Sequence, residues 1–267
     1  MARRESGARN GSEARIERRE FKYLVSRDTA ARVRDAVAAF CVLDRHAALS
    51  PDHRYTIESL YLDTPSLALY RANEVELLDR VKLRVRHYPD HPGGDVFLEV
   101  KRRVHDVIDK TRGRLPHDGW QRLVDDPFAP LTGPAADNPA VERFLAIQHT
   151  LGARPGMLVR YQREAWMGIH ENYARVTFDT AIRAQICEVA DFAPDPGHWR
   201  PLDDAYSQKS AVAASAVVLE LKFESLAPTW MQAIIESLDL WRLSYSKYGN
   251  GVQAFFVPPE SRMEAVR

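Results

Sequence analysis

The chain has 267 residues, of which 45% are hydrophobic and 28% are charged, so it can build the core of one large domain or two small ones. Lysine plus arginine and aspartate plus glutamate number 37 each, and a general nucleic-acid binder is not expected because that class usually carries a basic excess. No apolar run is long enough for a membrane span. The polar N-terminus has no apolar segment typical of a signal peptide, so a cytoplasmic location is expected.

Residues 1–15 are rich in Arg, Glu, Gly, Ser and Asn and are expected to form a disordered tail. One ordered domain is predicted over residues 16–257, because neither a repeat nor an internal boundary is visible, and residues 258–267 are expected to form a second tail. Cys41 and Cys187 are too few for a disulfide framework and have no metal-ligand spacing.

Strands are predicted wherever charged and apolar residues alternate. In chain order they begin near residue 16 and recur at 55–63, 77–88, 95–103, 104–115, 157–166, 174–179 and 216–224. Helices are predicted over 26–40, 64–70, 118–124, 139–151 and 228–238, where apolar residues follow a helical period or a capping residue precedes them. The polar, proline-containing residues 191–214 are predicted to form a long loop.

The segment 77–88 organises the chain, because basic residues occupy every second position of it. These are Arg80, Lys82, Arg84 and Arg86. Alternate side chains of a strand point to opposite faces, so one face is a row of cations and the other is apolar. This strand and the next one, which contains Glu99 and Lys101, are predicted to form a hairpin. A solvated face is the ordinary explanation for one such strand.

The same alternation of cations with apolar residues recurs along most of the strands. Solvated faces would not explain why these faces are mostly cationic in a chain of zero net charge. A closed antiparallel barrel with the cations pointing inward would explain it, and closure also removes exposed strand edges. Collecting cations is costly in the empty protein through repulsion and desolvation. The pattern therefore predicts a polyanion ligand, and the few carboxylates among the cations suggest a divalent metal held against phosphate oxygens.

Eight short motifs, in this order, resemble those of the VTC domain. They are Glu20-Phe21-Lys22-Tyr23, Ser59-Leu60-Tyr61-Leu62-Asp63-Thr64-Pro65, Lys82-Leu83-Arg84-Val85-Arg86, Leu98-Glu99-Val100-Lys101, Arg160-Tyr161, Arg175-Val176-Thr177-Phe178-Asp179, Leu219-Glu220-Leu221-Lys222-Phe223 and Ser246-Lys247-Tyr248. This family is the polyphosphate-polymerase branch of the triphosphate tunnel metalloenzymes, related to CYTH domains. The resemblance implies an α+β fold, with a closed antiparallel eight-stranded β-barrel as the tunnel and helices packed outside.

The resemblance also implies roles for particular residues. The residues expected to bind phosphate are Lys22, Lys82, Arg84, Arg86, Lys101, Lys110, Arg112, Arg160, Arg175 and Lys222. Glu220, with Glu20, is expected to hold the metal. Lys247 is expected to lie near the reacting phosphate, before a turn at Gly249-Asn250-Gly251.

The activity implied is transfer of the γ-phosphoryl group of ATP to a growing polyphosphate chain, with Mn²⁺ or Mg²⁺. The expected ligands are ATP or another triphosphate and polyphosphate, and inositol phosphates are a further possible class. A separate membrane protein is a possible partner. Ser244 replaces a second lysine that some polymerases carry, and Arg18 replaces the first glutamate of the hydrolase branch. A tunnel triphosphatase, a nucleotidyl cyclase and a non-catalytic polyphosphate or inositol-phosphate binding module therefore stay open as alternatives.

Overall fold

The computed structural model describes residues 18–256 except 92, 106, 172, 193–194 and 204–215. The strands are β1 (Arg18–Val25), β2 (Cys41–Leu43), β3 (Tyr55–Asp63), β4 (Asp79–His87), β5 (Val96–Val104), β6 (Val107–Leu115), β7 (Arg154–Gly168), β8 (Arg175–Ile186), β9 (Arg200–Pro201) and β10 (Val217–Glu224). The α-helices are α1 (Arg27–Val37), α2 (Arg45–Leu49), α3 (Ala68–Glu74), α4 (Trp120–Asp125), α5 (Pro139–Leu151), α7 (Thr229–Ser237) and α8 (Lys247–Phe256). The predicted tails, 1–15 and 258–267, lie outside the described residues, as does much of the predicted 191–214 loop.

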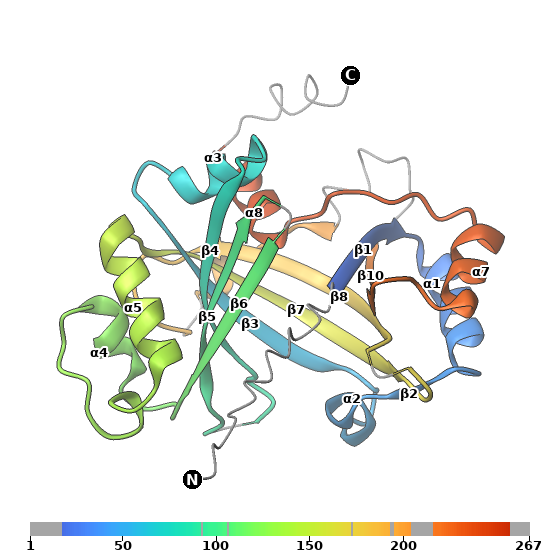
Figure 1. Cartoon of the computed structure of the whole chain (residues 1–267), viewed down its shortest axis with the longest axis horizontal. Coiled ribbons are helices and arrows are strands. Elements are labelled where there is room, and N and C mark those ends of the chain that lie inside the picture. The colour runs from blue at the N-terminus through green and yellow to red at the C-terminus, as the bar shows by residue number, and fades with distance from the viewer. Residues whose placement is uncertain are drawn as a thin grey trace, which may run out of the picture.

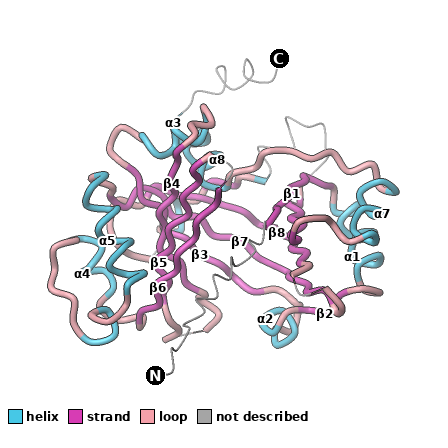
Figure 2. Tube along the Cα trace, viewed as in Figure 1, coloured by secondary structure: helices cyan, strands magenta, loops and turns pink. Residues whose placement is uncertain are grey.

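The strands form one ten-stranded sheet in the order β1-β10-β8-β7-β3-β4-β5-β6, with β2 added on β7 and β9 on β8. Figure 2 shows the strands in magenta. The mixed α+β class is therefore confirmed, but the prediction of a closed eight-stranded barrel is wrong. The strands at the two ends of this order, β1 and β6, are not paired with each other among the described residues. Instead, residues 242–243 run along β1, where Tyr23 forms a bridge with Arg242 and the Leu243 amide donates to the Lys22 carbonyl at 2.9 Å. Some of the backbone hydrogen-bonding groups at the free edge of β1 are therefore paired with this segment.

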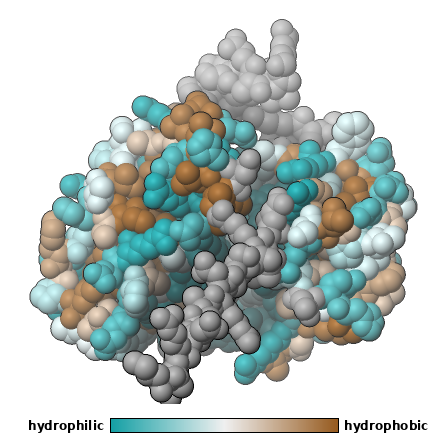
Figure 3. All heavy atoms as spheres, viewed as in Figure 1, coloured by the Kyte–Doolittle hydropathy of each residue, from teal (hydrophilic) through white to brown (hydrophobic). Residues whose placement is uncertain are grey.

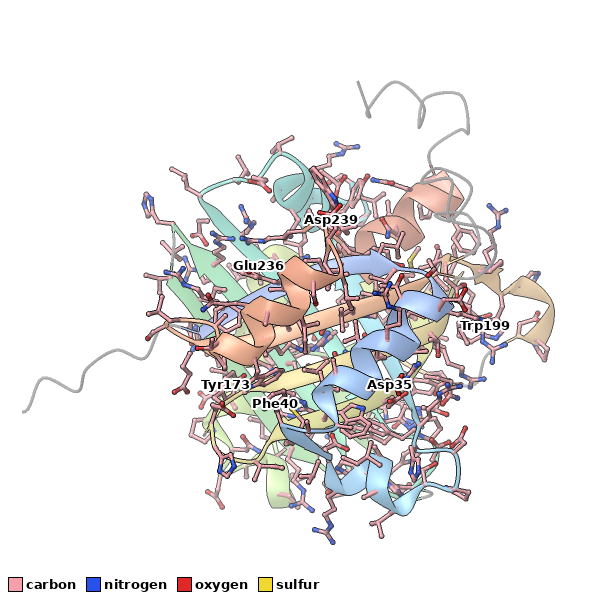
Figure 4. All side chains as sticks on the ribbon, turned by 90° about the vertical axis from the view of Figure 1, so that its right-hand side faces the viewer. Asp35, Phe40, Tyr173, Trp199, Glu236 and Asp239 are labelled. Carbon is pink, nitrogen blue, oxygen red and sulfur yellow. The ribbon has the colours of Figure 1, made fainter. Side chains whose placement is uncertain are left out.

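Helices cover the outer side of the sheet in two groups (Figure 1). On the left of that view, α4 and α5 lie beside β5 and β6, and on the right α1 and α7 lie together beside β10. Figure 4 looks onto the second group and shows α1 and α7 side by side in front of the strands. Strand residues of one parity fill the cores beneath them, for example Leu83 and Leu98 on one side and Leu221 on the other. The other parity forms what we call the inner face. No helix of the described part has the length and apolar character to cross a membrane.

Local signals account for most of these elements. Ser26 accepts a hydrogen bond from the Thr29 amide and caps α1, as capping preferences lead one to expect. The strand predicted at 55–63 and the helix predicted at 139–151 have the observed bounds.

The turn predicted at Gly249-Asn250-Gly251 is wrong, because all three residues lie within α8. The reason is packing: a Cβ on Gly251 would meet the Met157 sulfur at 2.2 Å, so this glycine lets α8 approach β7 closely.

Candidate functional site

The inner face brings together all but one of the predicted site residues. On the β1 side lie Glu20, Lys22, Arg175, Glu220 and Lys222, and on the β4 side lie Lys82, Arg84, Arg86, Lys101, Lys110 and Arg112. The sheet curls so far that Lys22 of β1 and Lys101 of β5 both contribute to lowering the pKa of Lys82 on β4, although burial is the larger cause. In the space-filling view from the same side as Figure 1, hydrophilic residues gather toward the middle of the molecule (Figure 3).

One buried carboxylate, Glu99, organises the cations of the β4 side. Four basic side chains surround its oxygens within 4 Å: Arg84 at 2.6 Å, Arg112 at 3.3 Å, Lys110 at 3.4 Å and Arg86 at 3.9 Å. Burial raises the pKa of Glu99, but Arg84 and the other cations outweigh burial and hold this pKa far below its usual range. The carboxylate therefore stays charged and fixes the arginines in place while leaving an excess of positive charge around it.

A second cluster, on the β1 side, surrounds Glu220 and Asp179. Lys222 Nζ lies 2.7 Å from Glu220, and Arg163 binds Asp179 through two contacts of 2.7 Å and reaches Glu220 at 3.3 Å. Lys247 Nζ contacts both carboxylates, at 2.6 Å from Asp179 and 3.3 Å from Glu220. Burial lowers the pKa of Lys247, but Asp179 and Glu220 outweigh burial and raise this pKa, so the ammonium stays charged although it is buried.

The residues just before α8 connect the two sides. Lys22 Nζ donates to the Tyr245 carbonyl at 2.9 Å, and Lys82 Nζ donates to Ser246 Oγ at 3.3 Å. The Tyr248 hydroxyl then anchors the first turn of α8 by donating to Asp63 at 2.7 Å. The start of α8 therefore places Lys247 between a lysine of β1 and a lysine of β4, at the point where the two sides of the inner face meet.

Residues 17–256 match the family model of the VTC domain. The chain belongs to the VTC domain family. No curated protein matches it significantly. Among solved structures, the "putative adenylate cyclase" of Bacillus halodurans is 13% identical with a TM-score of 0.47, covering 90% of this chain and 99% of its own. A "putative adenylate cyclase" of Vibrio parahaemolyticus is 12% identical with a TM-score of 0.41, covering 87% of this chain and 96% of its own.

Arg160 is the predicted site residue that this VTC domain does not place on the inner face. It lies on the other face of the sheet, where it pairs with the buried Glu58 and its guanidinium lies 5.2 Å from the ring centre of Trp199. Pairing of β3 with β7 runs without a break from Met157 to Arg163 and sets Arg160 opposite Glu58, so the regular alternation of β7 turns Arg160 away from the inner face. Arg163 takes the inward position instead.

Glu99, Arg163, Asp179 and Ser246 contact the predicted site residues on the inner face, but the sequence did not single them out as site residues. Arg160 and Arg163 are three residues apart and so lie on opposite faces of β7, and the sequence alone does not show which of these faces is the inner one. Asp179 has the same parity as Arg175 in the predicted strand, and this shared parity could have placed Asp179 on the inner face from sequence.

Glu20 and Glu220, the two predicted metal ligands, have the oxygens that a divalent cation needs. Lys22 lies 3.1 Å from Glu20 and 3.8 Å from Glu220, and Lys222 contacts the same pair at 3.8 and 2.7 Å. Burial raises the pKa of Glu20, but Lys222 and Lys22 outweigh it and lower this pKa to about 2. No group of three or more His, Cys, Asp or Glu side chains able to hold a metal occurs in the described ranges. The pair fits a metal only if a bound phosphate chain supplies further oxygens and draws the two ammonium groups away.

The opposite placement of Arg84 and Arg160 gives a matched prediction. Arg84→Ala should weaken tripolyphosphate binding by about 1.5–3 kcal/mol, the range for a hydrogen bond to a charged group. Arg160→Ala should leave the affinity within about 0.5 kcal/mol of the parent, because its guanidinium faces away from the inner face. Calorimetric titration of both variants checks this, and equal losses would mean that the two arginines share a binding surface.

Lys82 gives a pH-dependent prediction. Burial and the charges of Lys22 and Lys101 lower its pKa to about 7, so at pH 8 its amine is mostly neutral in the free protein. A bound polyanion favours the ammonium and raises this pKa again. Binding of tripolyphosphate at pH 8 should therefore take up protons, and affinity should fall as the pH rises above 7. Titrations in two buffers of different ionisation enthalpy measure the uptake, which Lys82→Met should reduce; heats that do not depend on the buffer would refute the prediction.

Proposed function

We propose that this VTC domain transfers the γ-phosphoryl group of ATP to a growing polyphosphate chain on its inner face. The observation that carries the proposal is the position of Lys247, a buried ammonium held by Asp179 and Glu220 beside the lysines of β1 and β4. Phosphoryl transfer needs positioning and neutralisation of charge more than covalent participation by the protein. A cationic face with one fixed ammonium at its centre meets this need.

In this proposal the two clusters have different roles: one binds phosphate groups and the other acts on the phosphate being transferred. Arg84, Arg86 and Arg112, preorganised by Glu99, bind the non-reacting phosphate oxygens, and guanidinium groups suit this role because they bind such oxygens in pairs. Lys247 donates to the phosphate being transferred and stabilises the charge that develops on the bridging oxygen. Glu220 and Glu20 would hold Mn²⁺ or Mg²⁺, which when bound neutralises further charge on the phosphate oxygens.

The carboxylates also explain how so many cations can lie together before a polyanion binds. Glu99, Asp179 and Glu220 are each buried and ionised among several cations, so they offset repulsion that would otherwise oppose collecting so many positive charges. A phosphate chain that enters can take over cations from these carboxylates without new charges being buried alone.

Products formed from ATP test the proposal and separate it from its alternatives. Purified protein is incubated with ATP and Mn²⁺, and the products are separated by gel electrophoresis. A ladder of phosphate chains supports the polymerase. Release of free phosphate alone identifies a triphosphatase, and release of pyrophosphate with a cyclic nucleotide identifies a cyclase. Tight polyphosphate or inositol-phosphate binding without turnover identifies a binding module.

A further inference from the structure

One end of the inner face is aromatic rather than cationic. Along β4 and just beyond it, the inward row Lys82, Arg84 and Arg86 is followed by Tyr88. Along β5, counted in the same direction, Lys101 and Glu99 are followed by Phe97. The rings of Tyr88 and Phe97 meet edge to face with their centres 5.9 Å apart. The charged stretch therefore ends at one side in a pair of rings.

The short helix α2 adds His46 to this end. Its ring is parallel to that of Tyr88, at 1° between the planes and 5.7 Å between the centres, and the side chain is exposed. Asp44 caps α2 through the Ala47 amide and also accepts from Arg175 at 2.8 Å and from the Tyr55 hydroxyl at 3.1 Å. The site residue Arg175 thus fixes the helix that presents His46. We call His46, Tyr55, Tyr88 and Phe97 the aromatic end.

Arg112 joins the aromatic end to the phosphate-binding cluster. Its guanidinium lies 3.6 Å from the ring centre of Phe97, donates to the Tyr88 hydroxyl at 3.2 Å and contacts Glu99 at 3.3 Å. Any ligand whose phosphates occupy the cations around Glu99 therefore has these rings as its next neighbours. An extended strand rises about 3.3 Å per residue, so Tyr88 lies roughly 20 Å from Lys82, enough for a phosphate chain followed by a nucleoside.

We propose that the aromatic end binds the base and ribose of a nucleotide substrate, with the terminal phosphate directed toward Lys82 and Lys247. The inference rests on the proposed function and fixes the direction in which a nucleoside triphosphate lies on the inner face. Aromatic rings stack on every nucleobase, so the subsite selects for a base as such and not for its identity. His46 is exposed, so the aromatic end reaches the surface where a base can approach, and its ring also lies 5.4 Å from that of His91.

Comparison of ATP with tripolyphosphate tests the subsite. Both ligands are titrated calorimetrically without divalent metal, so that no turnover interferes. His46→Ala and Tyr88→Ala should each raise the Kd for ATP about tenfold, as expected for loss of one stacking partner. The Kd for tripolyphosphate should change less than twofold in His46→Ala, and in Tyr88→Ala by no more than in Tyr88→Phe, which loses the same contact with Arg112. Tyr88→Phe, which keeps the ring, should retain most of the ATP affinity. His149→Ala is the matched control, because His149 also packs against an aromatic ring, meeting that of Phe128 edge to face, but away from the inner face. Both affinities should be unchanged.

Each other outcome overturns the inference in a recognisable way. Equal losses for both ligands would mean that the rings support the phosphate cluster or the fold. Unchanged affinities in both alanine variants would mean that no base is bound there while the phosphate site stands. A parent protein that binds neither ligand would remove the proposed function itself, and the subsite with it.

Discussion

Replacement of Lys247 by alanine should lower the maximal rate of ATP turnover about 100-fold or more. This is the scale of losing one preorganised donor at the site where charge develops. The remaining cations around Glu99 still hold the triphosphate, so the half-saturating ATP concentration should change far less. The measurement is the maximal rate and half-saturating ATP of Lys247→Ala beside those of Lys82→Ala, a neighbouring lysine on the inner face whose loss should mainly affect binding.

The structure adds a second consequence for Lys247→Ala. Its ammonium contacts Asp179 and Glu220, and breaking a buried ion pair by removal of one partner costs about 3–5 kcal/mol of folding stability. Thermal unfolding of the variant is therefore measured first, and rates are taken well below the transition. If the fraction of folded protein accounts for the entire loss of rate, Lys247 is a structural residue and the proposed mechanism fails.

Glu220→Gln should separate turnover from binding. Four cations lie within 4 Å of the Glu220 carboxylate: Lys22, Lys222, Lys247 and Arg163. The glutamine keeps the shape but removes the charge that holds a divalent ion, so turnover should drop severely and require more Mn²⁺. Metal-free polyphosphate binding should persist or tighten, because a negative charge leaves the inner face.

Two measurements decide the Glu220 prediction: turnover as a function of Mn²⁺ concentration and metal-free binding of polyphosphate. Glu99→Gln is the matched control, because it removes an equally buried carboxylate from the side that lacks a proposed metal ligand. It should disturb phosphate affinity without changing the Mn²⁺ concentration needed. A Glu220→Gln variant with unchanged turnover and metal requirement would show that the metal lies elsewhere.

Lowering the pH should reduce the stability of the fold through the same carboxylates. Burial raises the pKa of Glu220, but Lys222 and its other cations outweigh burial and hold this pKa well below its ordinary value. A carboxyl whose pKa is depressed by folding contributes stability above its unfolded pKa and loses that contribution as the pH falls through the folded value. The clusters therefore keep their ion pairs at neutral pH.

The inner face itself was predictable from sequence, because alternation along a strand is a local property. The parity of Lys82, Arg84 and Arg86 places all three on one face, whatever the rest of the chain does. The same reasoning located Glu20, Lys22, Glu220 and Lys222 on neighbouring strands. The resemblance to the VTC domain added the expectation that these faces belong to one site, and the family match confirms the membership.

What sequence reasoning missed depends on contacts between distant segments. Arg160 and Arg163 lie on opposite faces of β7, and only the pairing of β7 with its neighbour β3 shows which of the two faces inward. Closure of a barrel depends on whether its two edge strands meet, and here residues 242–243 lie along β1 instead. The glycines of α8 resemble a turn in sequence, but Gly251 serves the close packing of α8 against Met157.

The most direct test of the central claim is a crystal structure of the protein with tripolyphosphate and Mn²⁺. We expect the phosphate chain on the inner face, between the arginines held by Glu99 and the ammonium of Lys247, with Mn²⁺ touching Glu220 and the phosphate oxygens. Phosphate bound on the other face, beside Arg160 and Trp199, or an inner face that stays free of phosphate at saturating ligand, would contradict the account.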